Sequence, residues 1–462
     1  MRCGVRRVEL LRQITSGHRG DKMNVCQGIL GTLCATALAA HAAGPWTLDQ
    51  AIRHALTNSP DARIAQHRIA AAQAGLNQAR AAFSPQLQFQ SSYVRTDNPM
   101  LAFGSILNQH AVSSSPDFNN VPDQDNANFR GLLTLPLYAG GRNVAGRDSA
   151  RASAESASLE AIAVRNALEF EVARAFHTVS KTREFIAATE AGAQAFETNL
   201  ALANRRLNVG TLLKSDVLDV EVRLAQAREE AVRARNANAL ALRALRNLLG
   251  MEQGELEIAD SAPAASNTVP DVGDFQSRAE LAASAQKVRA AEADTRRASS
   301  GYQPRVSAFG SLDYDYGTRT DGSGHSYTAG VLLQWDLWDG LNTHAQRQAA
   351  DANLETAREQ QRKLRLALAL ELEQARLALR EASERLAVTA TSVAQAAESV
   401  DLTRSRFEQG LAISTQLIDA QTALIAARVR RAEAEADQKI AVAAVRQALG
   451  YAQLSNERST LK

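Results

Sequence analysis

The sequence predicts a mainly α-helical chain that is built twice on one plan and contributes four short strands to a transmembrane β-barrel. Three observations indicate this fold class: segments that match at a spacing of 200 residues, long helical stretches without proline, and runs that alternate apolar and polar residues. The chain has 462 residues, of which 45% are hydrophobic but only 5% aromatic. This composition favours long helices packed through small side chains over a bulky globular core.

Residues 1–42 are expected to form a secretory signal peptide. A lead rich in arginine and lysine precedes a short apolar run, and the sequence AHA at residues 40–42 then offers a small-x-small cleavage site. The apolar run is short for a bilayer span, so a membrane-anchoring helix is the weaker alternative. We therefore expect the mature chain to start near Ala43, with translation beginning at Met1 or at Met23.

All three cysteines of the chain lie in this segment, at Cys3, Cys26 and Cys34. A mature chain without thiols suits an oxidising compartment outside the cytoplasm. Lipidation of Cys34 is the alternative to cleavage after residue 42. The residues before it, Gly-Thr-Leu, lack the order that is usual in a lipoprotein signal. We therefore expect no lipid anchor.

The rest of the chain contains two copies of one structural plan. Leu132–Glu155 aligns with Leu332–Glu355 at a spacing of 200 residues, whereas Pro85 and Pro304 align at a spacing of 219. The difference of 19 residues is assigned to one loop that is longer in the first copy. Such self-similarity at a fixed spacing indicates an internal duplication. We expect a first repeat over residues 43–250, a polar linker over 251–275 and a second repeat over 276–462.

Long helices account for most of each copy. They are expected over about 48–82, 143–209 and 215–249 in the first copy, and over about 278–299, 342–409 and 415–449 in the second. At about 1.5 Å per residue, the helix over 143–209 would be about 100 Å long, which is too long for the interior of a compact domain. Charged residues alternate with alanine and leucine along these helices, as expected of helices packed side by side.

Four short strands have a different period. They are expected at about 84–95 and 128–139 in the first copy and at about 304–316 and 325–337 in the second. In the last of them, Tyr327, Val331 and Trp335 share an apolar face. Strands of about ten residues with one apolar and one polar face suit lipid on one side and water on the other. A half-buried strand of a soluble sheet alternates in the same way, and the alternation alone leaves both interpretations open.

Export and strand number together favour the membrane interpretation. The signal peptide delivers the chain outside the cytoplasm, and no later segment has the about 20 apolar residues of a spanning helix. Open strand edges are not tolerated in lipid, and the smallest barrels need about eight strands. Four strands must therefore be completed by further copies of the chain. A trimer would supply twelve strands.

This pattern resembles a known family, the outer-membrane efflux proteins, or TolC-like channels, of Gram-negative bacteria. The resemblance covers the whole expected mature chain and rests on the duplication, the strand pairs and the paired helix breaks. The motifs are FSPQL with PLYAGG, YQPRV with WDLWDG, NVGTLLKSDVLD and EQGLAISTQLID. The segment NPMLAFGSILNQ, Asn98–Gln109, is similar to a first extracellular loop of many members.

The resemblance implies a homotrimer with a 12-stranded β-barrel in outer-membrane lipid and an α-helical barrel that crosses the periplasm. It also implies partners: a periplasmic adaptor protein that receives the hairpin tips, and an inner-membrane transporter that supplies energy. The function implied is the exit duct of a tripartite efflux or type I secretion system. The alternatives are a periplasmic adaptor (membrane fusion) protein, which also has long helical hairpins, and a structural periplasmic coiled coil.

The paired helix breaks are where the resemblance places the hairpin tips. Gly210 and Gly410 would turn the chain, because glycine adopts the positive φ that a helix C-cap requires. Ser215, and either Ser414 or Thr415, would then cap the returning helices. The residues expected to contact the adaptor are Gly210, Leu212, Ser215, Gly410, Ile413 and Thr415.

The resemblance also points to a gate at these tips, formed by Asp419, Asp216 and Gln416. Three-fold symmetry would turn Asp419 into a ring of carboxylates that favours cations, and Asp216 would hold neighbouring hairpins together. The alternative is that both acids only complement the dipole of a helix start. The chain departs from some relatives here: Gln416 replaces a second acid, Ala412 a basic residue and Phe407 a tyrosine, which predicts a different polar lock.

No catalytic constellation is present, so the protein is not expected to be an enzyme. Six histidines of the expected mature chain are scattered without the spacing of metal ligands, and neither a phosphate loop nor a nucleophile elbow is found. We expect no cofactor and no metal. The formal net charge of +2 and the absence of a basic tract interleaved with aromatic residues argue against nucleic acid as a partner. The cargo, whether drugs, metals or proteins, is left open.

Overall fold

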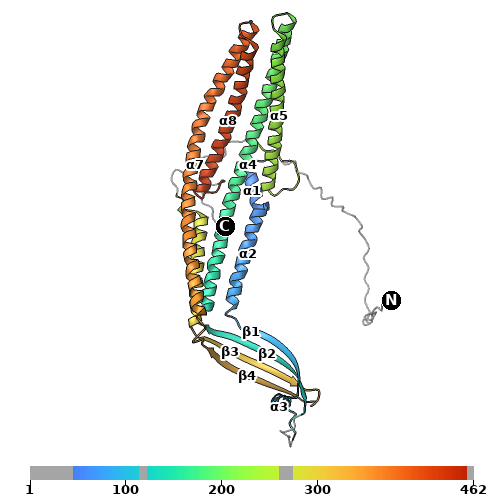
Figure 1. Cartoon of the computed structure of the whole chain (residues 1–462), viewed down its shortest axis with the longest axis vertical. Helices are drawn as coiled ribbons and strands as arrows, with labels where there is room; N and C mark the ends of the chain where they lie inside the picture. Colours follow the sequence, from blue (N-terminus) through green and yellow to red (C-terminus); the bar gives the residue numbers. More distant parts are fainter. Residues whose placement is uncertain (1–44, 114–121, 260–273, 455–462) are drawn as a thin grey trace, which may run out of the picture. The chain divides into compact units, whose positions relative to one another are not determined.

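The computed structural model describes residues 45–113, 122–259 and 274–454 (Figure 1). The chain divides into two units, Met1–Ala43 and Gly44–Lys462. The expected signal peptide, its cleavage site and the three cysteines lie outside the described residues, and so does most of the expected linker. All of the described helices and strands belong to the second unit.

The described chain is mainly helical and has four strands, as the sequence predicts. The first half contains α1 (Leu48–Asn58), α2 (Pro60–Ala81), β1 (Gln86–Thr96), α3 (Pro99–Asn108), β2 (Gln124–Ala139), α4 (Arg142–Asn208) and α5 (Lys214–Leu248). The second half contains the 3₁₀ turn η1 (Phe275–Ser277), α6 (Ala279–Ser299), the turn η2 (Ser300–Tyr302), β3 (Arg305–Tyr316), β4 (Ser323–Gln334), α7 (Asn342–Glu408) and α8 (Ser414–Ala448).

The expected first helix over 48–82 is in fact two helices, and this prediction was wrong. Ser59 separates α1 from α2, with φ −59° and ψ 138°. Pro60 follows it, and the proline ring disfavours the helical conformation in the residue before it. Pro60 itself fits the first position of α2, where its missing N–H has no helical partner to lose.

The strands also differ in detail from their expected ranges. β2 begins at Gln124, four residues earlier than expected, and β4 ends at Gln334 instead of near residue 337. The segment Trp335–Gly340 belongs to the turn that leads into α7, where Gly340 and Leu341 both have positive φ. The segment Asn98–Gln109, expected to be a loop, contains α3. Its helix starts at Pro99, and the side chain of Asn98 accepts hydrogen bonds from the next backbone N–H groups.

The strands form one antiparallel sheet in the order β1-β2-β3-β4, so β1 and β4 are its two edges. Residues that pair directly share a face: Leu87 pairs with Leu133, which in turn pairs with Gly310. This face is apolar and open to the surroundings, with exposed fractions of 80% for both Leu87 and Tyr327. The register shifts between Pro136 and Tyr138, where proline has no N–H to donate.

The opposite face of the sheet is polar and internally hydrogen-bonded. The side chain of Asn128 on β2 donates to Asp313 at 3.2 Å and to Asp315 at 3.1 Å on β3. Arg130 forms an ion pair with Asp313. These contacts join a strand of the first half to a strand of the second half. One polar and one exposed apolar face is the arrangement that the sequence predicts for strands between water and lipid.

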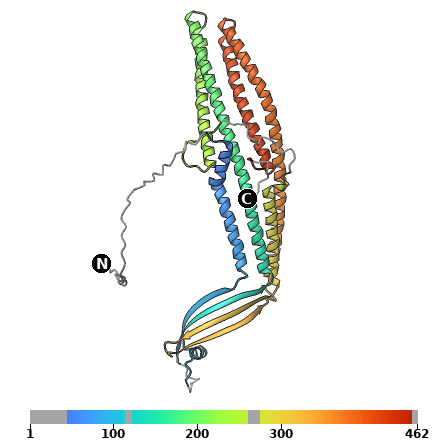
Figure 2. The same ribbon diagram turned by 180° about the vertical axis from the view of Figure 1, so that it is seen from behind.

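The long helices pack side by side in an order that both views show (Figures 1 and 2). α4 contacts α5, α8, α6 and α2, whereas α7 contacts α8 and α6. The helices α5 and α7 therefore lie at opposite margins of this layer. Gly192 of α4 lies against the side chain of Ile425 of α8, so closely that any Cβ at position 192 would collide with it.

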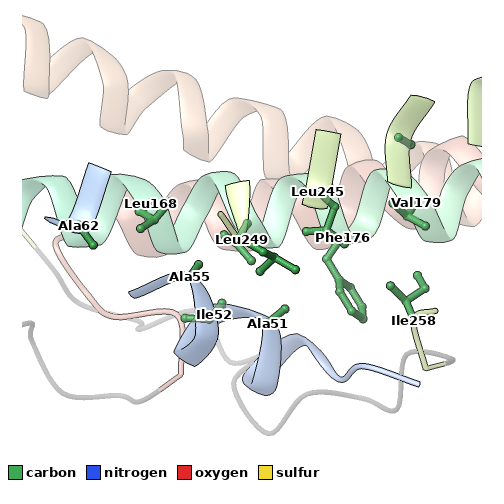
Figure 3. Packing of buried hydrophobic residues seen from close by; sticks show 12 residues of the cluster. Ala51, Ile52, Ala55, Ala62, Leu168, Phe176, Val179, Leu245, Leu249 and Ile258 are labelled. Atoms are coloured by element: carbon green, nitrogen blue, oxygen red, sulfur yellow. The ribbon is translucent and has the colours of Figure 1, made fainter. Parts of the chain in front are cut away.

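A hydrophobic cluster surrounds the short first helix (Figure 3). Ile52 of α1 and Leu245 of α5 are fully buried, and Phe176 of α4 is nearly so. Trp46 and Ile258 form a bridge beside this cluster, which fastens the start of the described chain to the segment after α5. Among the described residues, no helix is apolar over a length that would cross a membrane.

Candidate functional site

The two hairpin turns end their first helices in the same way. Gly210 and Gly410 have φ of 77° and 79°, which glycine adopts without steric cost. After α4, the N–H of Gly210 donates to Leu207 and that of Thr211 donates to Arg206. After α7, the N–H of Gly410 donates to Phe407, and Leu411 donates to Arg406 in the same pattern. This pair of bonds is the Schellman motif, which satisfies the last carbonyls of a helix.

The returning helices start differently from what the sequence suggested. Leu213 and Ile413 occupy the N-cap positions of α5 and α8, so neither Ser215, Ser414 nor Thr415 is the cap, and that prediction was wrong. The carboxylate of Asp216 accepts from the N–H of Leu213 at 3.4 Å, and the side-chain oxygen of Gln416 accepts from the N–H of Ile413 at 3.3 Å. An acid or amide at the third helical position performs this role in the capping box.

Asp216 also connects the two hairpins of the chain. Its second carboxylate oxygen accepts a hydrogen bond from the hydroxyl of Ser414, 3.2 Å away at the start of α8. Ser414 is 2% exposed, so this bond is shielded from water. The structure therefore places Asp216 both at a helix start and between neighbouring hairpins.

A second contact between the hairpins involves Arg206, which sequence reasoning missed. Its guanidinium donates to the carbonyl of Phe407 at 2.6 Å and lies 4.8 Å from the centroid of the Phe407 ring. Phe407 is 1% exposed. A cation over an aromatic face is attracted by the ring quadrupole. A phenylalanine at position 407 thus still takes part in a contact between hairpins. The signal available in the sequence was the basic pair before Gly210.

A small pocket of about 310 Å³ lies between the two tips. It is lined by both turns, including Gly210, Leu213, Gly410 and Ile413, and by the bridging groups Arg206, Asp216 and Ser414. Ala412, where some relatives have a basic residue, also lines it. The pocket therefore brings together residues of both repeats that are about 200 positions apart in the sequence.

Asp419 does not share in these contacts. It is exposed on α8, on the same side as Gln416 one turn earlier, whereas Leu417 and Ile418 between them are buried. The structure thus separates the two predicted gate acids: Asp216 is half-buried between hairpins, and Asp419 is open to the surroundings.

Apolar side chains stand out at the tips. Val209, Leu213, Leu411 and Ile413 are between 63% and 74% exposed. Ile413 and Leu212 were both predicted to contact the adaptor. Ile413 is exposed, whereas Leu212 packs against the buried cluster of the tip. Ser215 and Thr415 are exposed. Val209, Leu213 and Leu411 were missed, because the direction in which a turn residue points depends on the turn's geometry and not on its residue type.

The described residues contain no group of three or more histidine, cysteine, aspartate or glutamate side chains that could hold a metal ion. The tips present backbone turns, one carboxylate bridge and apolar side chains. Exposed apolar side chains of this kind suit contact with other protein chains.

Comparison with known proteins places these features in a family. The sequence matches the family described as outer membrane efflux protein over residues 51–251 and 275–451, most of the chain. A search of curated proteins found no match.

Solved structures with the same fold agree with this family. The outer membrane protein VceC from Vibrio cholerae has a TM-score of 0.74 at 19% identity, covering 87% of this chain and 96% of its own. The outer-membrane channel OprN has a TM-score of 0.77 at 18% identity, with coverage of 88% and 91%. The open state of the Neisseria gonorrhoeae outer membrane channel MtrE has a TM-score of 0.70 at 14% identity, with coverage of 89% and 91%.

One sheet with an exposed apolar face and two long hairpins fastened at their tips define the class of TolC-like outer-membrane channels. The chain belongs to the outer membrane efflux protein family. The predicted resemblance is thereby confirmed, and so is the predicted location: the protein lies in the outer membrane, with its helical part in the periplasm. The alternatives of a periplasmic adaptor and of a structural coiled coil do not fit this family.

Proposed function

We propose that the protein is the trimeric exit duct of a tripartite efflux or type I secretion system. The observation that carries this proposal is the four-stranded sheet, whose edges β1 and β4 have no further strand beside them in the described part of the chain. Its apolar face is exposed, as lipid contact requires. In lipid, open edges leave backbone groups without partners, and closure of a barrel satisfies them. Three copies would pair β4 of one chain with β1 of the next.

The helical layer supports the same closure. On α7, five exposed apolar residues form a stripe opposite the helix's buried side: Leu366, Leu370, Leu377, Val388 and Leu402. On α5, a second stripe lies opposite that helix's buried side: Leu218, Val222, Val232 and Leu240. Because α7 and α5 are at opposite margins of the layer, the stripe of one copy would meet the stripe of the next around a ring.

The tips would then surround the inner end of the duct. Asp216 and Arg206 hold the two hairpins of one chain together through Ser414 and Phe407. Asp419 is exposed on the same helix start and, repeated by three-fold symmetry, would form a ring of carboxylates that selects cations. Gln416 would act as a helix cap here and not as a second acid of the ring.

The exposed apolar tip residues fit a docking role. Val209, Leu213, Leu411 and Ile413 are more than 60% exposed, next to the turns at Gly210 and Gly410. A patch of apolar side chains with polar residues at its rim is typical of a protein interface. We assign this surface to the periplasmic adaptor, which would connect the duct to the inner-membrane transporter. Thr415 and Ser215 would lie at its rim.

Ion selectivity in planar bilayers tests this function. We expect the wild-type protein to form cation-selective channels that multivalent cations block from the periplasmic side. Asp419→Asn keeps the shape and removes the charge, so cation preference and block should weaken while the trimer persists. Asp219→Asn is the matched control, because Asp219 is the exposed counterpart in the first repeat. Unchanged selectivity in Asp419→Asn would show that this acid serves only its helix start.

A further inference from the structure

The short helix α3 lies on the polar face of the sheet. Gly324 on β4 pairs with Asp315, which belongs to that face. A Cβ at Gly324 would point to the same face and would collide with the backbone carbonyl of Asn108, the last residue of α3. Figures 1 and 2 show α3 at the end of the strands far from the long helices, on the concave side of the sheet. In a closed barrel, the polar concave face is the inner one.

Gln109, the residue after this helix, is held in place by side-chain hydrogen bonds. Gln109 is fully buried, and its amide nitrogen donates to the carbonyl of Asp125 at 2.7 Å and to the side chain of Asn126 at 2.9 Å. Its amide oxygen accepts from the hydroxyl of Thr320. Gly317 and Gly322 surround it so closely that a Cβ on either would collide with Gln109. The loop between β1 and β2 is thus locked onto the loop between β3 and β4.

The side of α3 that faces away from the sheet is apolar and uncovered in the described chain. Ala102 is fully buried against the protein. On the opposite side, Met100 is 82% exposed and Leu107 is 47% exposed. Gly104 lies between them, and a Cβ at this position would point into open space, with no packed neighbour within 4 Å. Residues at i, i+4 and i+7 form one stripe on a helix. A glycine in such a stripe allows another helix to approach closely.

The space inside a twelve-stranded barrel is limited. Eight strands leave room only for their own side chains, and the diameter grows about linearly with strand number. A helix with its side chains is about 10–12 Å across. Three copies of α3 on the inner face would therefore come into contact near the axis. α3 also contacts the edge strand β4, beside which the neighbouring copy would begin.

We propose that the Met100–Gly104–Leu107 stripe binds the same stripe of the other two copies and forms an apolar constriction at the outer mouth of the duct. This inference rests on the proposed trimer. It commits to further copies of this chain as the partner, because an inner-face helix is separated from lipid by the barrel wall. The outer constriction would be distinct from the gate at the periplasmic tips.

Disulfide cross-linking in outer membranes tests the contact. The natural cysteines are confined to positions 3, 26 and 34, so Leu107→Cys introduces a thiol in a region otherwise free of them. We expect mild oxidation to join Leu107→Cys chains into cross-linked pairs. A three-fold set holds three thiols, so about two thirds of the chains should be paired and the rest should stay single. Leu101→Cys is the matched control: it is 59% exposed on the same helix but off the stripe, and should cross-link far less.

Three results would overturn the inference without bearing on the trimer. The first is a Leu107→Cys protein that is trimeric by light scattering but does not cross-link. This result would refute the constriction and not the trimer. The second is equal cross-linking of Leu101→Cys and Leu107→Cys. The third is a spin label at position 107 that dissolved oxygen relaxes as strongly as it relaxes a label at Tyr327→Cys on the apolar face, because that would place α3 in lipid. A Leu107→Cys protein that is monomeric would refute the trimer together with the constriction.

Discussion

At the scale of single residues, Asp216 has two partners with different consequences. Its bond to the N–H of Leu213 starts α5, and its bond to the hydroxyl of Ser414 joins the two hairpins. Ser414→Ala removes only the second. A hydrogen bond to a charged group contributes about 1.5–3 kcal/mol, so we expect open tips to become at least about ten-fold more populated. The measurement is single-channel conductance in planar bilayers, which should rise.

Ser215→Ala is the matched control for this variant. Ser215 is the exposed serine beside Asp216 in the first hairpin and is not a cap. Its conductance should equal that of the wild type. If Ser414→Ala also leaves conductance unchanged, the bridge does not restrain the tips.

His177 on α4 predicts that the free energy of unfolding decreases in acid. Burial, together with the nearby charge of Lys439, lowers the pKa of His177 to about 4. The folded value lies below the ordinary value of about 6.5. Between the two, the unfolded chain binds a proton that the folded chain does not, so stability falls as pH decreases from about 6.5 to about 4. The loss would be about 3 kcal/mol at most. Thermal unfolding of His177→Gln should depend less on pH than that of the wild type; equal slopes would contradict this account.

At the scale of elements, the exposed apolar stripe on α7 predicts at which positions a charged side chain would disrupt assembly of the trimer. Leu370 is 59% exposed in the single chain, so Leu370→Lys should not disturb the fold of one chain. In a ring, the same lysine would be buried between copies without a partner, which is costly. We expect the trimer fraction in detergent to drop, as measured by native gel or light scattering. Ala378→Lys is the control, since Ala378 is exposed on α7 but off the stripe. Equal assembly of both variants would remove the stripe from the interface.

The long helices and their turns could be predicted from sequence because the signals are local. Gly210 and Gly410 end helices that contain no proline, and the structure places α4 and α7 within one residue of their expected bounds. The break at Ser59 also has a local signal in the sequence, because Pro60 disfavours a helical conformation at the residue before it. α3 has one too, in Asn98 followed by Pro99.

The contacts between hairpins could not be predicted from these local signals. Arg206 of α4 lies over Phe407 of α7, and Asp216 of α5 bonds to Ser414 of α8, only because the two hairpins pack together. The same holds for Leu212 and Leu213: one packs inward and the other is exposed, and only the turn geometry decides which. Residue types predicted where the site lies, and packing determined which side chains form it.

At the scale of the whole molecule, the uncovered edges and apolar surfaces of one chain are those expected of one subunit in a ring of three. In the described part of the chain, the sheet has two edges without a neighbouring strand, its apolar face is exposed, and the marginal helices α5 and α7 present apolar stripes. A single chain would leave all of these uncovered. The structural relatives share the fold over about nine tenths of the chain, and the family is that of outer-membrane efflux proteins.

The number of chains in the purified protein tests the central claim most directly. Light scattering of the detergent-solubilised protein, corrected for bound detergent, should give three copies per particle. Circular dichroism in parallel should show intact helices and strands. Three copies with this secondary structure agree with a closed barrel of twelve strands. A monodisperse monomer that keeps its strands would contradict the account, because β1 and β4 would then be stable as open edges.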